Sequence, residues 1–76
     1  LGGKLTHRQR ELLLDAVRHP DKIYRIDQHK QIQDISYQTA RTDLLALAKL
    51  KLMRSERIGK AFVFAPVKDL VEKLKA

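Results

Sequence analysis

The sequence contains no cysteine. A chain without cysteine forms no disulfide framework, no thiolate zinc site and no cysteine nucleophile, and it fits a reducing compartment. The sequence also lacks an apolar run long enough to span a membrane, and no signal peptide is visible. We therefore expect a cytoplasmic protein that has no membrane partner.

Patterns for catalysis and metal binding are missing as well. The three histidines, His7, His19 and His29, do not have the spacing of metal ligands. No trio of residues supports nucleophilic catalysis. We expect no metal, no cofactor and no enzymatic activity on this chain, and we expect His29 to pack at the edge of the core.

Acidic residues are scarce relative to basic ones. Nine Asp and Glu stand against 16 Lys and Arg, which gives a formal net charge of +7. The excess is concentrated between residues 49 and 60, where the only acid is Glu56. The basic residues of this segment are Lys49, Lys51, Arg54, Arg57 and Lys60. Such an excess indicates a polyanionic partner, although it also serves solubility alone.

The length of 76 residues suits one small domain. The chain begins at Leu1 and not at methionine, so we expect it to be a fragment of a larger protein. Residues 1–5 are interpreted as the end of a linker or a cloning remnant, and residues 6–76 as the domain. Helices are predicted at about 6–18, 27–34, 36–50 and 67–75, and strands at about 23–26, 52–58 and 61–65.

The first predicted helix begins with a capping box formed by Thr6 and Gln9. It ends at His19-Pro20, because the residue before proline is pushed out of the helical region. Its apolar residues predict a buried stripe. These residues are Leu12, Leu13, Leu14, Ala16 and Val17.

The centre of the chain carries a helix, a tight turn and a capped helix. Asp27 is expected to cap the helix at 27–34, and Asp34 lies at the turn, because Asp tolerates the left-handed conformation. Ser36 then caps the helix at 36–50. This arrangement is typical of a helix-turn-helix. On the last helix, Asp43 is expected to pair with an arginine or lysine of another element.

The remainder predicts a hairpin and a terminal amphipathic helix. Two β-like runs flank Gly59-Lys60, and Phe62 and Phe64 alternate onto one face, where we expect an aromatic core. The strand at 23–26 can join the hairpin. The predicted fold class is therefore α+β: a winged helix-turn-helix with a three-helix core, a small three-stranded antiparallel sheet and an extra C-terminal helix.

The helix-turn-helix residues resemble a known signature. Residues 35–44, with Leu47 and Leu52-Met53, are similar to the motif of DeoR-type bacterial repressors. The longer stretch from Thr6 to Pro66 resembles the C-terminal winged-helix domain of Fic-family proteins. That resemblance rests on three segments, which are Tyr24-Arg25-Ile26, the Ser36 to Leu44 run, and Gly59-Lys60-Ala61-Phe62-Val63-Phe64.

The resemblance implies a DNA-binding regulatory module of transcription, attached to a preceding domain of a bacterial Fic-type parent. Fic enzymes transfer AMP to hydroxyl groups with an HPFxxGNGR motif, and that motif is absent here. Any such catalysis would lie in the parent domain. Two positions depart from the repressor pattern: Thr42 replaces a second arginine, and Lys51 replaces a glycine, so that Lys51 must be left-handed or the cap must differ.

The polar face of the helix at 36–50 supplies candidate contacts to double-stranded DNA. Base contacts are predicted for Gln38, Arg41 and Thr42, whose side chains suit base edges. Backbone contacts are predicted for Ser36, Tyr37, Lys49, Arg54, Arg57 and Lys60, with Lys4 and Arg8 adding non-specific contacts. An ordinary solvated helix face and a charged hairpin that resists aggregation remain open alternatives.

A second function is also open. Leu45 falls in the middle of the predicted polar face, opposite Ala40 and Leu47. Leu45 and the C-terminal helix are therefore candidate surfaces for a homodimer. This alternative is a protein–protein interaction or dimerisation module that regulates the parent protein without binding DNA.

Overall fold

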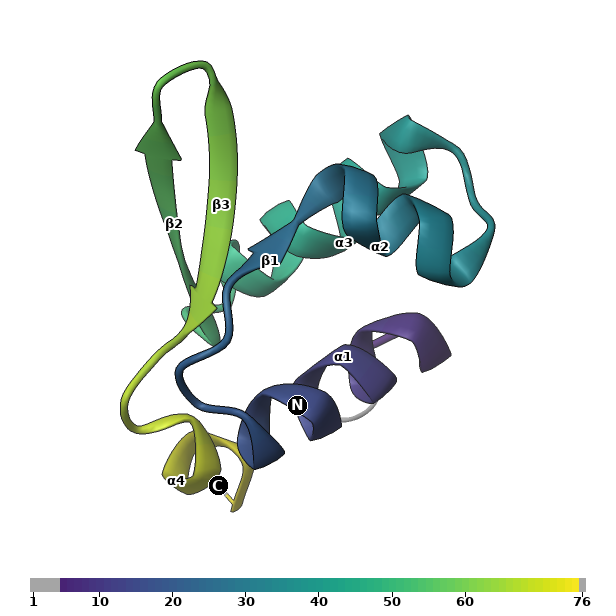
Figure 1. Cartoon of the computed structure of the whole chain (residues 1–76). Coiled ribbons are helices and arrows are strands. Elements are labelled where there is room, and N and C mark those ends of the chain that lie inside the picture. Colours follow the sequence, from purple (N-terminus) through teal and green to yellow (C-terminus); the bar gives the residue numbers. More distant parts are fainter. Residues whose placement is uncertain (1–4, 76) are drawn as a thin grey trace.

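A three-stranded sheet and four helices make up the computed structural model, which describes residues 5–75 (Figure 1). The elements are α1 (His7–Arg18), β1 (Tyr24–Arg25), α2 (Ile26–Gln33), α3 (Tyr37–Lys49), β2 (Met53–Ile58), β3 (Ala61–Pro66) and α4 (Leu70–Lys75). Residues 1–4 of the predicted linker, with Lys4 among them, lie outside the described residues. Leu5 packs partly buried against the core.

The sheet is antiparallel with the strand order β1-β3-β2. Tyr24 pairs with Phe64, and Phe64 pairs with Ser55. Because side chains alternate across a strand, Tyr24, Phe64 and Met53 share the sheet face that is buried. The fold is therefore α+β and winged-helix-like, as the sequence predicts.

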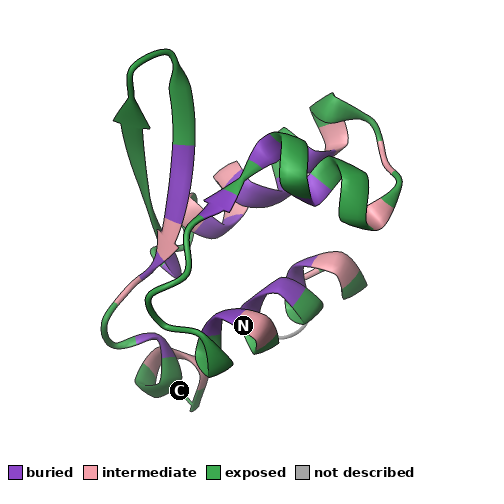
Figure 2. Cartoon of the chain, viewed as in Figure 1, coloured by how far each residue is buried: buried purple, intermediate pink, exposed green. Residues whose placement is uncertain are grey.

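The core lies between the buried sheet face and the inner faces of α1, α2 and α3 (Figure 2). Its largest fully buried side chains are Phe64, Leu44, Leu47 and Leu52. α1 and α3 contribute their apolar stripes to this core, and Leu70 packs α4 against it. The hairpin extends beyond this core, so its distal half is exposed to solvent (Figure 2).

The turn between α2 and α3 has the geometry that the sequence predicts. Asp34 is left-handed, with φ 53° and ψ 51°. Ile35 follows partly buried, and its N–H donates to the Lys30 carbonyl at 3.2 Å. The Ser36 hydroxyl oxygen accepts from the Thr39 N–H at 3.1 Å and so caps α3. This cap fixes where α3 begins.

Three predicted boundaries need correction. The strand at 23–26 is only Tyr24–Arg25, and Ile26 is the first residue of α2, where it is buried in the core. Arg25, not Asp27, is therefore the N-cap of α2, and it makes no side-chain capping bond. α4 begins at Leu70 and not at residue 67. The Val67 carbonyl accepts a hydrogen bond from the Leu70 N–H, which forms a turn before the helix.

Four predicted apolar positions also differ. Phe62 is 45% exposed, while Phe64 is completely buried. The two rings share a sheet face, but Phe62 lies near the hairpin tip, beyond the reach of the helices. Leu14 and Val17 are exposed because α1 buries only one stripe. Leu45 packs partly buried against the core and is not in the middle of a polar face.

Candidate nucleic-acid interface

α3 presents polar side chains along the face that is turned away from the core. Gln38, Arg41 and Lys49 are exposed, and their side chains make no hydrogen bond or ion pair with any residue from 5 to 75. Thr42 is exposed as well, and its hydroxyl donates to the Gln38 carbonyl at 2.9 Å. The helix therefore holds amide and guanidinium groups that are free for a partner.

The hairpin that follows α3 carries the other cations. Arg54 donates to the Glu56 carboxylate at 3.0 Å. The Arg57 guanidinium lies 5.8 Å from the centroid of the Phe62 ring, and its Nε donates to the Gly59 carbonyl at 3.3 Å. Gly59 takes a φ of +61° at the turn, and Lys60 follows it. Phe62 and the turn thus hold one guanidinium in place at the hairpin tip.

All the residues predicted to contact DNA through α3 and the hairpin are exposed. They are Ser36, Tyr37, Gln38, Arg41, Thr42, Lys49, Arg54, Arg57 and Lys60. They lie on two adjoining elements, α3 and the β2–β3 hairpin, which are joined by a short turn at residues 50–52. The Ser36 hydroxyl is less available to a partner, because it also donates a hydrogen bond to the Thr39 hydroxyl at 2.9 Å.

Acidic residues are scarce along the segment that forms α3 and the hairpin. Between residues 35 and 68 the only acids are Asp43 and Glu56. Asp43 is buried, and Glu56 is paired with Arg54. The exposed side chains of this segment therefore carry a net positive charge, while Asp34 lies just before it and Asp21 lines a hollow together with Arg54 and Glu56.

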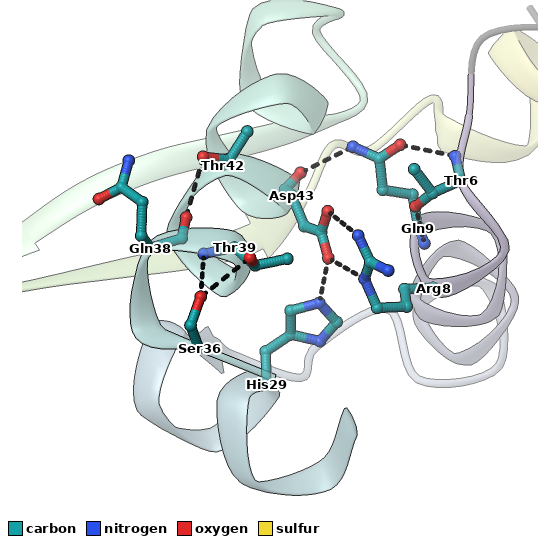
Figure 3. Close-up of polar contacts among 9 residues, drawn as sticks. All are labelled: Thr6, Arg8, Gln9, His29, Ser36, Gln38, Thr39, Thr42 and Asp43. Atoms are coloured by element: carbon teal, nitrogen blue, oxygen red, sulfur yellow. Dashed lines mark hydrogen bonds and ion pairs between the residues drawn. The ribbon is translucent and has the colours of Figure 1, made fainter. Parts of the chain in front are cut away.

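Asp43 is the centre of a buried polar network that joins three helices (Figure 3). Its carboxylate accepts from Arg8 Nε at 2.8 Å and from Arg8 Nη2 at 3.2 Å. His29 Nε2 lies 2.9 Å from the same carboxylate. The Gln9 amide donates to the Asp43 backbone carbonyl at 3.2 Å. The network fixes α1 and α2 against the inner side of α3.

The pKa of Asp43 reflects two opposing influences. Burial acts to raise it, but the hydrogen bonds and charges of Arg8 and His29 outweigh burial and hold the pKa below its usual value. The carboxylate is therefore ionised and paired with the Arg8 guanidinium. This pairing with Arg8 confirms the expected structural role of Asp43.

The same network corrects one predicted contact and adds residues that the sequence does not reveal. Arg8 is not available for DNA in the way predicted, because Asp43 engages it through two nitrogens. Gln9 serves both the capping box and α3: its Oε1 accepts from the Thr6 N–H at 2.9 Å, while its amide nitrogen reaches Asp43. The capping motif was a signal for the first role but not for the second.

A shallow hollow of about 270 Å³ lies between α1 and α2. Leu12, Tyr24 and Ile32 are its apolar lining, and two of its charged groups, Asp15 and Lys22, pair with each other. Asp15 accepts from the Tyr24 hydroxyl at 2.7 Å and from Lys22 at 2.9 Å. These two hydrogen bonds lower the pKa of Asp15, while burial and then the Asp15 bond raise the pKa of Tyr24. The cluster is therefore structural: it ties β1 to α1.

Residues 5–75 contain no group of three or more His, Asp or Glu side chains placed to hold a metal ion. Within the same residues, no helix combines the length and the apolar character needed to cross a membrane. Comparison of the chain with protein-family models, with curated proteins and with solved structures finds no match.

Proposed function

We propose that this chain is a DNA-binding winged-helix module in which α3 enters the major groove and the β2–β3 hairpin contacts the DNA backbone. The observation that carries the proposal is the net positive charge of the segment that forms α3 and the hairpin. From residue 35 to 68, the only acids are buried Asp43 and paired Glu56, while Arg41, Lys49 and Lys60 remain uncommitted. A surface of this kind attracts phosphates.

Each side chain has a role that its chemistry suits. Gln38 and Arg41 offer amide and guanidinium donors to base edges, and Thr42 offers a methyl group and a hydroxyl. Lys49, Arg54 and Lys60 offer charge to phosphates without reading sequence, as do the exposed Tyr37 hydroxyl and Ser36 at the start of α3. Arg57, held over Phe62, needs little ordering before it contacts the backbone.

Binding to a fluorescein-labelled duplex, followed by fluorescence anisotropy over a salt series, tests the proposal. Non-specific dissociation constants for such modules are about 10⁻⁶ to 10⁻⁴ M at physiological salt, and affinity falls as salt rises. We expect measurable affinity at low salt that weakens with a linear log–log slope. An absence of binding at low salt and about 100 µM protein would overturn the proposal.

Three alanine variants separate the roles. Lys60→Ala should weaken binding to all sequences and reduce the salt slope by about 1. Arg41→Ala should cost about 1–3 kcal/mol on a preferred site and relax the sequence preference. Arg10→Ala is the matched control: Arg10 is exposed on α1, outside the proposed surface, so its loss should leave the salt slope nearly unchanged.

A second candidate is a module that binds a protein or a second copy of itself and regulates a larger protein. It is favoured by apolar side chains left exposed on α1 and α4, namely Leu14, Val17 and Val71. Leu45 and Leu74 are weaker support, since both pack partly buried against the core. A Leu14→Glu or Val71→Glu variant that loses a partner but keeps duplex affinity would favour this candidate.

The parent protein remains part of the proposal. The Ser36 to Leu44 run and the Gly59 to Phe64 segment support a bacterial Fic-type parent, with this chain as its C-terminal regulatory domain and cytoplasmic function. The sequence that precedes Leu1 in the gene tests this directly. A Fic motif upstream is the expected result, and a different catalytic or regulatory domain there would overturn it.

A further inference from the structure

β2 forms a free edge of the sheet. The strand order is β1-β3-β2, so β2 pairs with β3 on one side, and no other described strand pairs with it on the other side. Figure 1 shows it as the outer strand of the projecting hairpin. Unpaired N–H and C=O groups on such an edge are a template for another strand.

The side chains along this edge alternate in charge. Arg54 and Glu56 are two residues apart, so they share the sheet face that points away from the core. Their side chains are 58% and 54% exposed and form an ion pair of 3.0 Å. Both side chains can therefore contact a further charged group while they remain paired.

A second copy of β2 can meet this edge in an antiparallel, two-fold symmetric way. The two-fold axis is perpendicular to the sheet and passes midway between a residue and its own copy, with which it pairs, so that both buried faces lie on the same side. Two such registers overlap five of the six residues in Met53–Ile58. The register centred on Glu56 puts two Glu56 side chains together. The register centred on Ser55 puts Arg54 of each copy opposite Glu56 of the other. Only this last register joins opposite charges.

We propose that β2 is a homodimer edge, through which two copies of the chain join antiparallel about Ser55 into a continuous six-stranded sheet. Each copy keeps its Arg54–Glu56 ion pair, and the four charges then alternate in sign around a square. Charged side chains, Lys above all, commonly protect a sheet edge, and like charges placed opposite one another repel a second copy. The alternation found here is self-complementary under the two-fold axis.

The proposal does not depend on DNA binding, and it uses neither Leu45 nor α4. The proposed partner of β2 is a second copy of the chain, because the charges of β2 are complementary to themselves about Ser55. Nothing in this charge pattern selects an unrelated strand. Cross-strand pairs of opposite charge stabilise a sheet, whereas like charges placed directly opposite destabilise it. Reversing one charge should therefore have a large and symmetric effect.

Sedimentation equilibrium of the 76-residue chain at low salt, from low micromolar to about 1 mM, tests the proposal. The wild type should show a monomer–dimer equilibrium. Arg54→Glu and Glu56→Arg should each raise the dissociation constant about tenfold, because each turns two attractive contacts into repulsive ones. The double variant, Arg54→Glu with Glu56→Arg, should restore dimerisation. Circular dichroism establishes that each variant is folded.

Arg57→Glu is the matched control, and Glu56→Gln distinguishes the registers. Arg57 lies opposite Met53 of the second copy in the proposed register, so its reversal should change the dissociation constant less than about twofold. In the register centred on Glu56, Glu56→Gln would remove the repulsion between two carboxylates and strengthen the dimer, whereas in the proposed register it removes two attractive contacts and weakens the dimer. A dimer strengthened by Glu56→Gln would overturn the proposal. A strictly monomeric wild type, or a double variant that fails to recover, would also overturn it.

Discussion

Arg8 and Asp43 lie 35 residues apart in the chain and meet through two hydrogen bonds, Arg8 Nε–Asp43 Oδ2 at 2.8 Å and Arg8 Nη2–Asp43 Oδ1 at 3.2 Å. One carboxylate thus holds the first turn of α1 against the middle of α3. His29 adds a third contact from α2. The orientation of the face that we propose for DNA therefore depends on a residue that does not touch DNA.

Asp43→Asn tests the strength of this connection. The amide keeps the shape of the carboxylate but removes its charge, so the Arg8 and His29 contacts lose their ionic partner. Because Asp43 is only 4% exposed, we expect the free energy of unfolding to fall by about 3 kcal/mol. Urea denaturation followed by circular dichroism measures it.

Asp21→Asn is the matched control. Asp21 is exposed, and its side chain makes no hydrogen bond or ion pair within residues 5–75. We expect its unfolding free energy to stay within about 0.5 kcal/mol of the wild type. Equal losses in the two variants would show that Asp43 is no more than a surface charge.

Stability should fall on acidification. The pKa of Asp43 lies below its usual value despite burial, because Arg8 and His29 bond to it, and hydrogen bonds from Tyr24 and Lys22 lower the pKa of Asp15. The unfolded chain, with aspartate pKa values of about 3.9, therefore binds protons first as the pH falls. The contribution is complete at neutral pH, begins to decline below about pH 5 and is lost as the pH passes the folded-state values.

Urea denaturation between about pH 7 and pH 3 measures this decline. Asp15→Asn should lower the stability at neutral pH and should reduce the loss on acidification, because one of the two depressed carboxyls is gone. A wild type whose stability is constant over this whole range would contradict the prediction.

Local signals in the sequence were sufficient for much of the fold. Asp34 at the turn and Thr6 and Ser36 as caps act through residues within four positions, and the structure has each of them in its predicted role. Lys51 is likewise left-handed, one of the two options that the missing glycine left open. Alternation alone could not separate Phe62 from Phe64. Their difference depends on where the helices end over the sheet, which is a property of the tertiary structure.

Only part of the polar network around Asp43 can be predicted from the sequence. The place of Asp43 on its helix indicated a pairing role, and the structure confirms it. Its partners could not be named, because Arg8 and His29 reach it from 35 and 14 residues away. The sequence predicts instead that Arg8 is a free cation that contacts DNA. Long-range pairing of this kind depends on how α1 crosses α3, and no pattern within one helix encodes that.

The two phenylalanines of β3 offer a matched comparison. Phe64 is fully buried in the same core cluster as Leu44 and Leu47, so Phe64→Ala should cost about 3–5 kcal/mol of unfolding free energy. Phe62→Ala should change it by about 0.5 kcal/mol or less, because the ring is 45% exposed. Urea denaturation of both variants gives the difference. A large loss for Phe62→Ala would mean that the hairpin tip is packed in solution.

Lys51 ends α3 in a conformation that glycine adopts more easily. Its φ is 63°, its N–H donates to the Ala48 carbonyl, and the Leu52 N–H donates to the Leu47 carbonyl, both at 3.0 Å. These are the bonds of a Schellman motif, whose left-handed position is usually glycine. We expect Lys51→Gly to raise the unfolding free energy by about 0.5–1 kcal/mol, because the strain of a left-handed side chain exceeds the entropic cost of glycine.

Lys49→Gly, two residues earlier, supplies the control for that variant. Lys49 is helical, so glycine there should lower the unfolding free energy by about 1 kcal/mol. Both variants remove one positive charge from the same region, and thermal or urea denaturation compares them directly. Changes of opposite sign in the unfolding free energy would show that backbone conformation, and not the lost charge, causes the effect. If both variants were destabilised equally, the positive φ of Lys51 would carry no strain, and the missing glycine at the end of α3 would have no energetic consequence.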